Sequence, residues 1–165
     1  SGLNLPFYAA GKVEHLWGLD PSRENWALTE GSRASVDFGF EFLQASADSI
    51  PLDDASADCV LMTYTLCSLP AVCPALEEMR RVLKPEGQLI FCEHGTAPDA
   101  RVRRWQYRLN PLWRRVSGGC NLNRTAPELL QQGGFTIQEM EAAYIPGWKP
   151  ASYNYWGIAR PVRFA

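Results

Sequence analysis

Residues 58–92, DCVLMTYTLCSLPAVCPALEEMRRVLKPEGQLIFC, contain the pattern that decides the fold. Asp58–Tyr64 is a continuous apolar run, which is typical of a strand covered on both faces. The following apolar residues fall on one face of a helix predicted from Ala71 to Leu83. Lys84–Gly87 is predicted to end that helix in a turn, and Gln88–Cys92 forms the next buried strand. The pattern therefore indicates a strand–helix–strand unit with parallel strands.

Two more strands and a helix are predicted on the N-terminal side of this unit. Val13–Leu19 is predicted to form a strand that stops at Asp20-Pro21, and Ser22 is suited to cap a helix that runs to about Val36. Phe40–Gln44 alternates apolar and polar residues, as a strand does. Together with its later elements, the chain of 165 residues is predicted to form a single α/β domain. Its sheet would be doubly wound, Rossmann-like and mostly parallel.

The C-terminal part of the chain differs in character. Between Arg101 and Arg115, six arginines alternate with tryptophan, tyrosine and leucine. Thr125-Ala126-Pro127-Glu128 resembles a capping box, and the helix that it opens would end at Gly133-Gly134. The tail contains two strand-like segments joined by a short loop, at residues 135–144 and 153–163. Their closeness in the sequence predicts an antiparallel strand at the C-terminal end of the sheet.

Charge and composition exclude several classes of protein. Sixteen basic and eighteen acidic residues give a net charge of −2, so no nucleic-acid partner is expected. No apolar run approaches the length of about 18 residues that a membrane span needs. The first residues carry no recognisable signal peptide, and a cytoplasmic location is the simplest interpretation.

The five cysteines, an odd number, favour a reducing compartment over a disulfide framework. Cys59 and Cys92 lie in apolar runs, where cysteine packs as a small hydrophobic residue. No cysteine or histidine has the spacing of a zinc motif, so no metal site is predicted. The alternative at this point is a soft-metal or arsenic site at Cys67 and Cys73.

Two loops carry polar groups suited to a nucleotide-like cofactor. Asp20 follows a predicted strand, where a carboxylate can accept hydrogen bonds from two ribose hydroxyls or can cap the next helix. The segment around Ala47-Asp48 also follows a strand, and its backbone could contact an adenine edge or form a plain surface turn.

In order and spacing, these segments resemble the class I S-adenosylmethionine-dependent methyltransferases from Ser1 to about Glu93. The resemblance implies S-adenosyl-L-methionine as cofactor, with its ribose held at Asp20 beside Pro21. It aligns Gly2 with the end of the family's glycine-rich turn. The adenine loop falls on Ser46, Ala47 and Asp48, and the methyl-donor site on Thr63, Thr65 and Leu66.

The family's first strand and the opening glycines of its turn have no counterpart in this sequence. That strand lies at the centre of the family's sheet, so an N-terminally truncated domain with two unpaired strand edges is expected. Pairing through those edges would give a homodimer. Because these parts of the family's pattern are missing, a second hypothesis is a degenerate, non-catalytic binding module that acts through a partner. A nicotinamide-dependent dehydrogenase is a weaker alternative.

A narrower resemblance covers Thr65–Leu69, Cys92–Gly95, Gly118–Arg124 and Pro146-Gly147. These segments are similar to a subgroup with small-molecule acceptors that includes the eukaryotic membrane-associated thiol methyltransferases. This sequence shows no counterpart of the hydrophobic N-terminal anchor of the eukaryotic members, so membrane association is not expected to carry over. The resemblance implies in-line SN2 methyl transfer to a small molecule, with the acceptor atom left open among thiol, nitrogen, oxygen, carbon and metalloid.

Candidate acceptor-site residues follow the last strand of the resemblance. His94 lies where open α/β sheets bind ligands, so it is a candidate catalytic base or a loop-bonding residue. Glu93 could bind substrate or hold His94. Residues 95–125 are predicted to form a lid, with Trp105 as a wall; a basic face for RNA or lipid and a solvated helix are the alternatives. Asn121 and Arg124 would contact the acceptor or stabilise their loop.

Overall fold

The computed structural model describes residues 2–9, 11–27 and 36–162. The chain divides into two compact units, residues 1–51 and residues 52–165, and each is described by itself. Among the described residues, no helix combines the length and apolar character that crossing a membrane requires.

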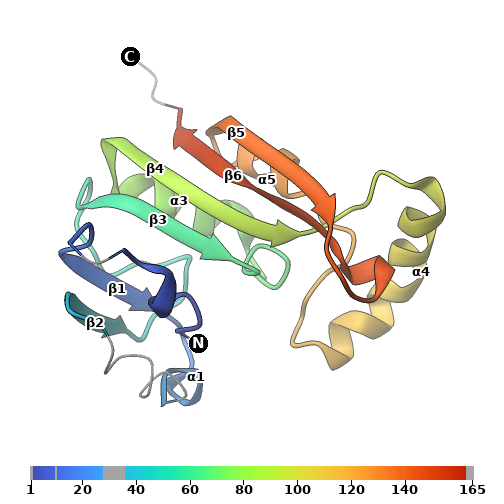
Figure 1. The fold of residues 1–165 in the computed structure, drawn as a ribbon, viewed down its shortest axis with the longest axis horizontal. Helices are drawn as coiled ribbons and strands as arrows, with labels where there is room; N and C mark the ends of the chain where they lie inside the picture. Colours follow the sequence, from blue (N-terminus) through green and yellow to red (C-terminus); the bar gives the residue numbers. More distant parts are fainter. Residues whose placement is uncertain (1, 10, 28–35, 163–165) are drawn as a thin grey trace. The chain divides into compact units, whose positions relative to one another are not determined.

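The first unit is built on two parallel strands, β1 (His15–Leu19) and β2 (Gly39–Leu43), preceded by the short 3-10 helix η1 (Leu5–Phe7) (Figure 1). Helix α1 (Arg23–Ala27) follows β1. Trp26 on this helix stacks on the rings of Phe40 and Phe42, with centroids 4.9 and 4.3 Å apart. These aromatic contacts tie the helix to the strand, where offset stacking adds to the burial of apolar area.

Ser22 caps α1 as the sequence predicts, because its Oγ accepts a hydrogen bond from the Asn25 N–H at 3.2 Å. The predicted helix to Val36 is seen only as far as Ala27, and residues 28–35 lie outside the described residues. Ser1 and Gly2 are predicted to be the last two residues of a glycine-rich turn. Ser1 lies outside the described residues, whereas Gly2 is described and has a positive φ of 66°.

The second unit contains a four-stranded sheet in the order β3-β4-β6-β5. Strands β3 (Ala57–Thr63) and β4 (Leu83–His94) are parallel, whereas β6 (Tyr153–Pro161) runs antiparallel to both β4 and β5 (Phe135–Tyr144). The mixed α/β class and the antiparallel C-terminal strand are therefore confirmed. Among the described residues β3 pairs only with β4, so it forms an edge of its sheet.

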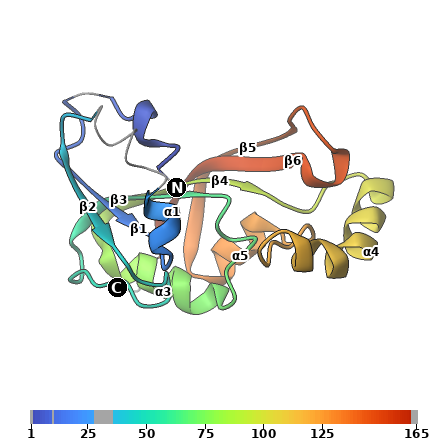
Figure 2. The same ribbon diagram turned by 90° about the horizontal axis from the view of Figure 1, so that it is seen from below.

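Helices α3 (Val72–Val82) and α5 (Ala126–Gln132) lie on the same face of this sheet (Figure 2). Between helices and sheet lies an apolar core, whose fully buried members include Leu76, Leu83, Leu89, Phe91, Leu130 and Phe135. Helix α4 (Ala100–Val116) and the 3-10 helix η2 (Lys149–Ala151) contact each other at the end of the sheet where β4 finishes. The core thus fixes the ends of β3 and β4, where the candidate site lies.

Three predictions about local structure are wrong. Lys84–Gly87 is not a free turn but a bulged part of β4, because the partner of Ala57 is Leu83 while that of Cys59 is Gln88. The run Asp58–Tyr64 is not covered on both faces, since Cys59 is exposed on the edge strand. The capping box at Thr125 does not form, because its side chain makes no cap hydrogen bond.

Candidate functional site

The loop that follows β3, residues 64–69, organises the candidate site. The Tyr64 N–H donates to the Cys92 carbonyl at 2.9 Å, which continues the ladder between β3 and β4 by one step. Tyr64 has a φ of 50°, in the left-handed region that a residue with a side chain seldom adopts. The chain then turns tightly, since Ser68 and Leu69 both donate backbone N–H groups to the Thr65 carbonyl. Strained backbone held in place by its surroundings is a common feature of functional loops.

Glu93 at the end of β4 fastens this loop to the sheet. Its Oε1 accepts the Thr65 N–H at 2.6 Å, and its side chain is 1% exposed. Burial raises the pKa of Glu93 to about 7, although hydrogen bonds from the backbone of Thr65, Leu66 and Cys67 oppose the rise. Its other oxygen, Oε2, has no hydrogen-bond partner among the described residues. Glu93 is therefore a buried carboxyl group that clamps the loop with one oxygen.

Asn121 and Arg124, which precede α5 in the chain, also hold the loop at residues 64–69. Arg124 donates through Nη1 to the carbonyls of Leu66 and Leu69, the latter at 2.8 Å. Asn121 donates both its backbone N–H and its side-chain Nδ2 to the Cys67 carbonyl, each at 2.8 Å. These bonds satisfy loop carbonyls that would otherwise be buried without partners. Asn121 and Arg124 therefore stabilise the loop, which is one of the two roles expected of them.

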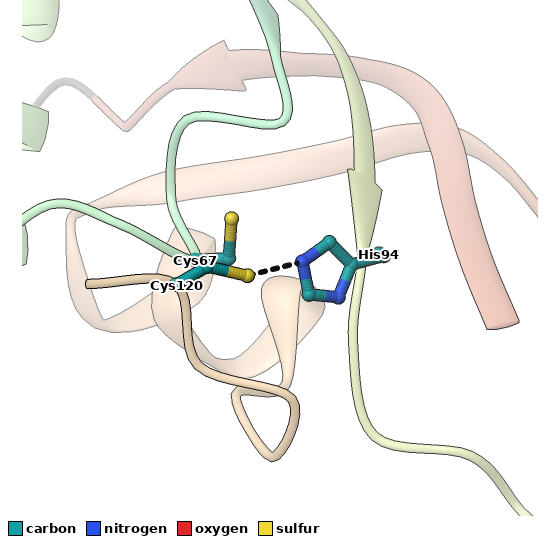
Figure 3. Close-up of side chains that lie close together, drawn as sticks. All are labelled: Cys67, His94 and Cys120. Carbon is teal, nitrogen blue, oxygen red and sulfur yellow. Dashed lines mark hydrogen bonds between the residues drawn. The ribbon is translucent and has the colours of Figure 1, made fainter. Parts of the chain in front are cut away.

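Cys67, His94 and Cys120 meet at the centre of this arrangement. Figure 3 shows the two cysteine sulfurs, from separate loops, next to the ring of His94 at the end of β4. His94 Nε2 lies 3.0 Å from Cys120 Sγ, and the three side-chain atoms all lie within 4.8 Å of one another. His94 Nδ1 is buried and has no hydrogen-bond partner among the described residues, so Nε2 is the nitrogen that contacts Cys120 Sγ.

Hydrogen bonding makes the two thiols of the cluster unequal. The pKa of Cys120 is lowered by hydrogen bonds between its sulfur and Cys67, His94 and Trp113, with the bond to Cys67 the largest cause. Trp113 contributes its indole Nε1–H at 3.3 Å. The pKa of Cys67 is raised, first by its hydrogen bond to Cys120 and then by burial. The arrangement therefore favours a thiolate at Cys120 beside a thiol at Cys67.

Helix α4 is anchored to this region by a buried amide. Gln106 is fully buried and accepts the Ala97 N–H at 2.9 Å, while its Nε2 donates to the carbonyls of Gly95 and Pro150. Trp105, the predicted acceptor-pocket wall, is 48% exposed and has the Arg108 guanidinium 6.0 Å from its ring centroid. From this helix, Trp113 rather than Trp105 contacts the cluster. The predicted lid role of residues 95–125 stays a prediction.

Within the first unit, the predicted cofactor residues share one edge. Asp20 follows β1 and Ser46 follows β2, and parallel pairing puts the carboxyl ends of both strands on the same side. The Asp20 carboxylate accepts the Ser22 N–H at 2.9 Å, which closes a turn just before α1, whereas the cap of α1 is Ser22 itself. Ser46 begins a tight turn containing Ala47 and Asp48, closed by a hydrogen bond from the Ser49 N–H. Pro21 accepts a bond from Gln44 Nε2.

Within the second unit, Thr63, Thr65 and Leu66 lie at the carboxyl end of β3, as predicted. Sequence reasoning missed Cys120 and Trp113 as members of the cluster and paired Cys67 with Cys73, which is exposed and outside it. The proximity of Cys67 and His94 could have been predicted from their places at the ends of neighbouring strands. Cys67 follows β3 and His94 ends β4, and adjacent parallel strands bring such residues together.

Comparison with known proteins gives a consistent family signal. Residues 1–91 match the model of the family described as "Methyltransferase domain". The chain is 31% identical over 163 residues to the human thiol S-methyltransferase TMT1B, covering 96% of this chain and 66% of that protein. With the rat TMT1B it shares 30% over 158 residues, covering 94% and 62%. The chain thus spans about two thirds of the length of these relatives.

Solved structures resemble this chain in fold. A crystal structure of a SAM-dependent methyltransferase from Methanosarcina mazei superposes with a TM-score of 0.71 at 21% identity, covering 90% of this chain and 82% of that one. The [4+2]-cyclase SpnF superposes with a TM-score of 0.72 at 18% identity, covering 98% and 72%. A methyltransferase and a cyclase thus share this architecture, so the fold by itself does not fix the reaction.

Proposed function

The chain belongs to the class I S-adenosylmethionine-dependent methyltransferases, and from this premise we propose that it transfers a methyl group to the sulfur of a small-molecule thiol. The observation that carries the proposal is the extent of the match to thiol S-methyltransferases. That match covers 94–96% of the chain, whereas the general methyltransferase model ends at residue 91. The likeness to thiol methyltransferases therefore extends over the segments that carry His94, Cys120 and Arg124.

S-adenosyl-L-methionine is the cofactor of this family, and its methyl group is carried on an electrophilic sulfonium. In our proposal, Asp20 holds the ribose hydroxyls and the Ser46–Asp48 turn contacts the adenine, while Thr63, Thr65 and Leu66 border the methyl donor. The donor chemistry fits: Asp20 offers a carboxylate and the turn offers backbone groups, both at the carboxyl ends of strands.

The work left to the protein is to place and deprotonate the acceptor. A thiol attacks as its thiolate, so a group that removes the proton near neutral pH is needed. His94 is suited to this role by its place at the end of β4, because an imidazole ring can accept a proton. The new bond forms between the acceptor sulfur and the methyl carbon, the old bond between that carbon and the sulfonium breaks, and S-adenosylhomocysteine leaves with the bonding electrons. In our proposal the loop at residues 64–69, held by hydrogen bonds from Arg124 and to Glu93, helps to keep the two partners in line.

The proposal is tested by incubating the protein with S-adenosylmethionine and matched acceptors that differ in one atom, a thiol, an amine and an alcohol on the same alkyl or aryl scaffold. Methylated product is detected by mass spectrometry. Product from the thiol alone is expected. We expect His94→Ala to lower turnover by about 100-fold, while His15→Ala, which changes the other histidine, leaves it unchanged.

Two outcomes would contradict the proposal in different ways. Methylation of the amine or alcohol in preference to the thiol would replace the acceptor while keeping the reaction. Failure to bind S-adenosylhomocysteine in calorimetry would favour the alternative, a non-catalytic binding module. Calorimetry is therefore run before the acceptor series.

A further inference from the structure

We propose that Cys67 Sγ, His94 Nε2 and Cys120 Sγ form a binding site for a zinc(II)-class metal ion, with a fourth coordination position that accepts the thiol substrate. The part that concerns the substrate rests on the proposed function, whereas the site itself rests on geometry. It differs from the soft-metal alternative that the sequence suggests, because Cys73 is exposed and outside the cluster.

The three donor atoms are already close to the arrangement that one ion requires. Tetrahedral zinc, with bonds of about 2.3 Å to sulfur and about 2.0–2.1 Å to nitrogen, separates its ligand atoms by roughly 3.5–3.8 Å. Here His94 Nε2 and Cys120 Sγ are 3.0 Å apart, and all three atoms lie within 4.8 Å of one another. Adjustments of less than about 1 Å at each atom would therefore accommodate the ion.

The donor set selects the class of metal. Two thiolates and one imidazole are soft to borderline ligands, which suit zinc(II) and do not suit magnesium or calcium. Two thiolates also balance the charge of a divalent ion, so the loaded site is neutral before substrate enters. Three protein ligands with an open fourth position are typical of catalytic zinc sites, whereas structural sites are closed by four.

The surrounding residues hold the ligands as a built site. The Cys67 carbonyl receives two hydrogen bonds from Asn121, and Ser68 Oγ lies 3.4 Å from Cys67 Sγ. The Trp113 indole donates to Cys120 Sγ, a contact that a metal-bound thiolate also accepts. Such outer contacts fix ligand orientation and raise the affinity for the ion.

A bound ion would give the site a way to activate a thiol that does not depend on a base. The substrate thiol binds at the fourth position, its proton is released to solvent, and its sulfur is held as a thiolate. That sulfur then forms its bond to the methyl carbon while the sulfonium–carbon bond breaks, and the thioether product leaves the metal. His94 serves as a ligand in this scheme and no longer as the proton acceptor.

The first test measures metal binding by the whole chain after reduction and removal of bound metal with a chelator. Cobalt(II) is titrated in, because its absorption reports four-coordinate geometry and thiolate-to-metal charge transfer, and zinc(II) is then added to displace it. One ion per chain with both spectral features is expected. Binding without charge-transfer bands, or no binding, would overturn the site.

Variants separate the cluster from the other cysteines. Cys67→Ser and Cys120→Ser are each expected to weaken zinc binding at least about 100-fold, since outer contacts alone account for about 10–100-fold. Cys73→Ser, an exposed cysteine outside the cluster, should bind as the unchanged chain does. If a variant fails to fold, zinc protection of Cys67 and Cys120 from iodoacetamide in the unchanged chain answers the same question. Equal labelling with and without zinc would overturn the proposal.

A second test separates this inference from the proposed function. Chelation should lower thiol methylation at least tenfold, and zinc(II) should restore it. Metal binding with undiminished methylation by the stripped protein would overturn the role of the ion in holding substrate. Thiol methylation by a protein that binds no metal would overturn the whole inference and leave the proposed function intact.

Discussion

The buried carboxylate of Glu93 accepts the Thr65 N–H at 2.6 Å and so joins the end of β4 to the loop that follows β3. The bond connects residues that are 28 positions apart in sequence. Because the loop also carries Cys67, the position of this thiol depends on a carboxyl group that is almost inaccessible to water. A change in the charge of Glu93 is therefore expected to alter the position of the loop that carries Cys67.

Glu93→Gln should change how stability depends on pH. The pKa of Glu93 is raised to about 7 in the folded chain, so the folded state binds more protons than the unfolded state between about pH 4.5 and 7. Stability contributed by the protonated carboxyl is fully present below that range and is lost as pH rises through about 7. The loss amounts to roughly 3 kcal/mol at most.

Glutamine keeps an oxygen for the Thr65 N–H but cannot ionise, so the variant should lack this decline. Urea denaturation at a series of pH values between 4.5 and 8 measures it. Glu86→Gln is the matched control, because Glu86 is exposed and its ion pair with Arg160 lies at the surface. Parallel pH profiles for the Glu93 variant and the unchanged chain would show that Glu93 is not buried as described.

Arg124→Met should destabilise the chain by about 2–3 kcal/mol, since it leaves the carbonyls of Leu66 and Leu69 without their charged donor. The size of the effect follows from burial: a partly buried guanidinium that bridges two carbonyls cannot be replaced by water at no cost. Denaturant midpoints give the measurement. Arg160→Met removes an exposed arginine from a surface ion pair, and a change within about 0.5 kcal/mol is expected there. Equal losses for the two variants would contradict a special role for Arg124.

Trp113→Phe should raise the pKa of Cys120. The substitution removes the indole N–H that donates to Cys120 Sγ at 3.3 Å and leaves an aromatic ring in its place. A hydrogen bond to a charged sulfur is worth about 1.5–3 kcal/mol, so an upward shift on the order of one pH unit is expected. Iodoacetamide labelling of Cys120, followed by peptide mass spectrometry in the presence of a chelator, gives the titration curve.

Trp105→Phe serves as the comparison for this experiment, because Trp105 lies on the same helix but is half exposed and contacts Arg108. Its titration curve should match that of the unchanged chain. A shift caused by Trp105→Phe and not by Trp113→Phe would mean that helix α4 presents a different face to the cluster.

Much of this fold can be predicted from the spacing of apolar residues. Buried residues alternate along much of β4, whereas those of α3 lie on one face of the helix. The bulge at Lys84–Gly87 escapes such reasoning, since Pro and Gly in sequence signal a turn and only pairing with β3 shows that the strand continues. The exposure of Cys59 also escapes it, because an apolar run does not reveal which strand lies at an edge.

The candidate site is only partly predictable for a related reason. His94 and Glu93 could be predicted because they end a strand, and strand ends are where open sheets bind ligands. Cys120 lies 26 residues from His94, in a loop whose path is set by helix α4 and by the bonds of Asn121. The spacing of residues along the sequence does not reveal such a contact, so the sequence suggests Cys73 as the partner of Cys67 instead of Cys120.

Asp20→Asn should weaken binding of S-adenosylhomocysteine about 10- to 100-fold, as expected when a carboxylate that accepts two ribose hydroxyls becomes an amide. The asparagine Oδ1 can still accept the Ser22 N–H, so the turn before α1 should be preserved. Isothermal calorimetry measures the affinity, and the denaturation midpoint checks the fold. Asp37→Asn provides the control, since Asp37 is exposed and precedes β2 rather than following a strand. Weaker binding accompanied by a clear loss of stability would assign Asp20 to holding the turn before α1, because a ribose ligand affects affinity without affecting the folding of the free chain.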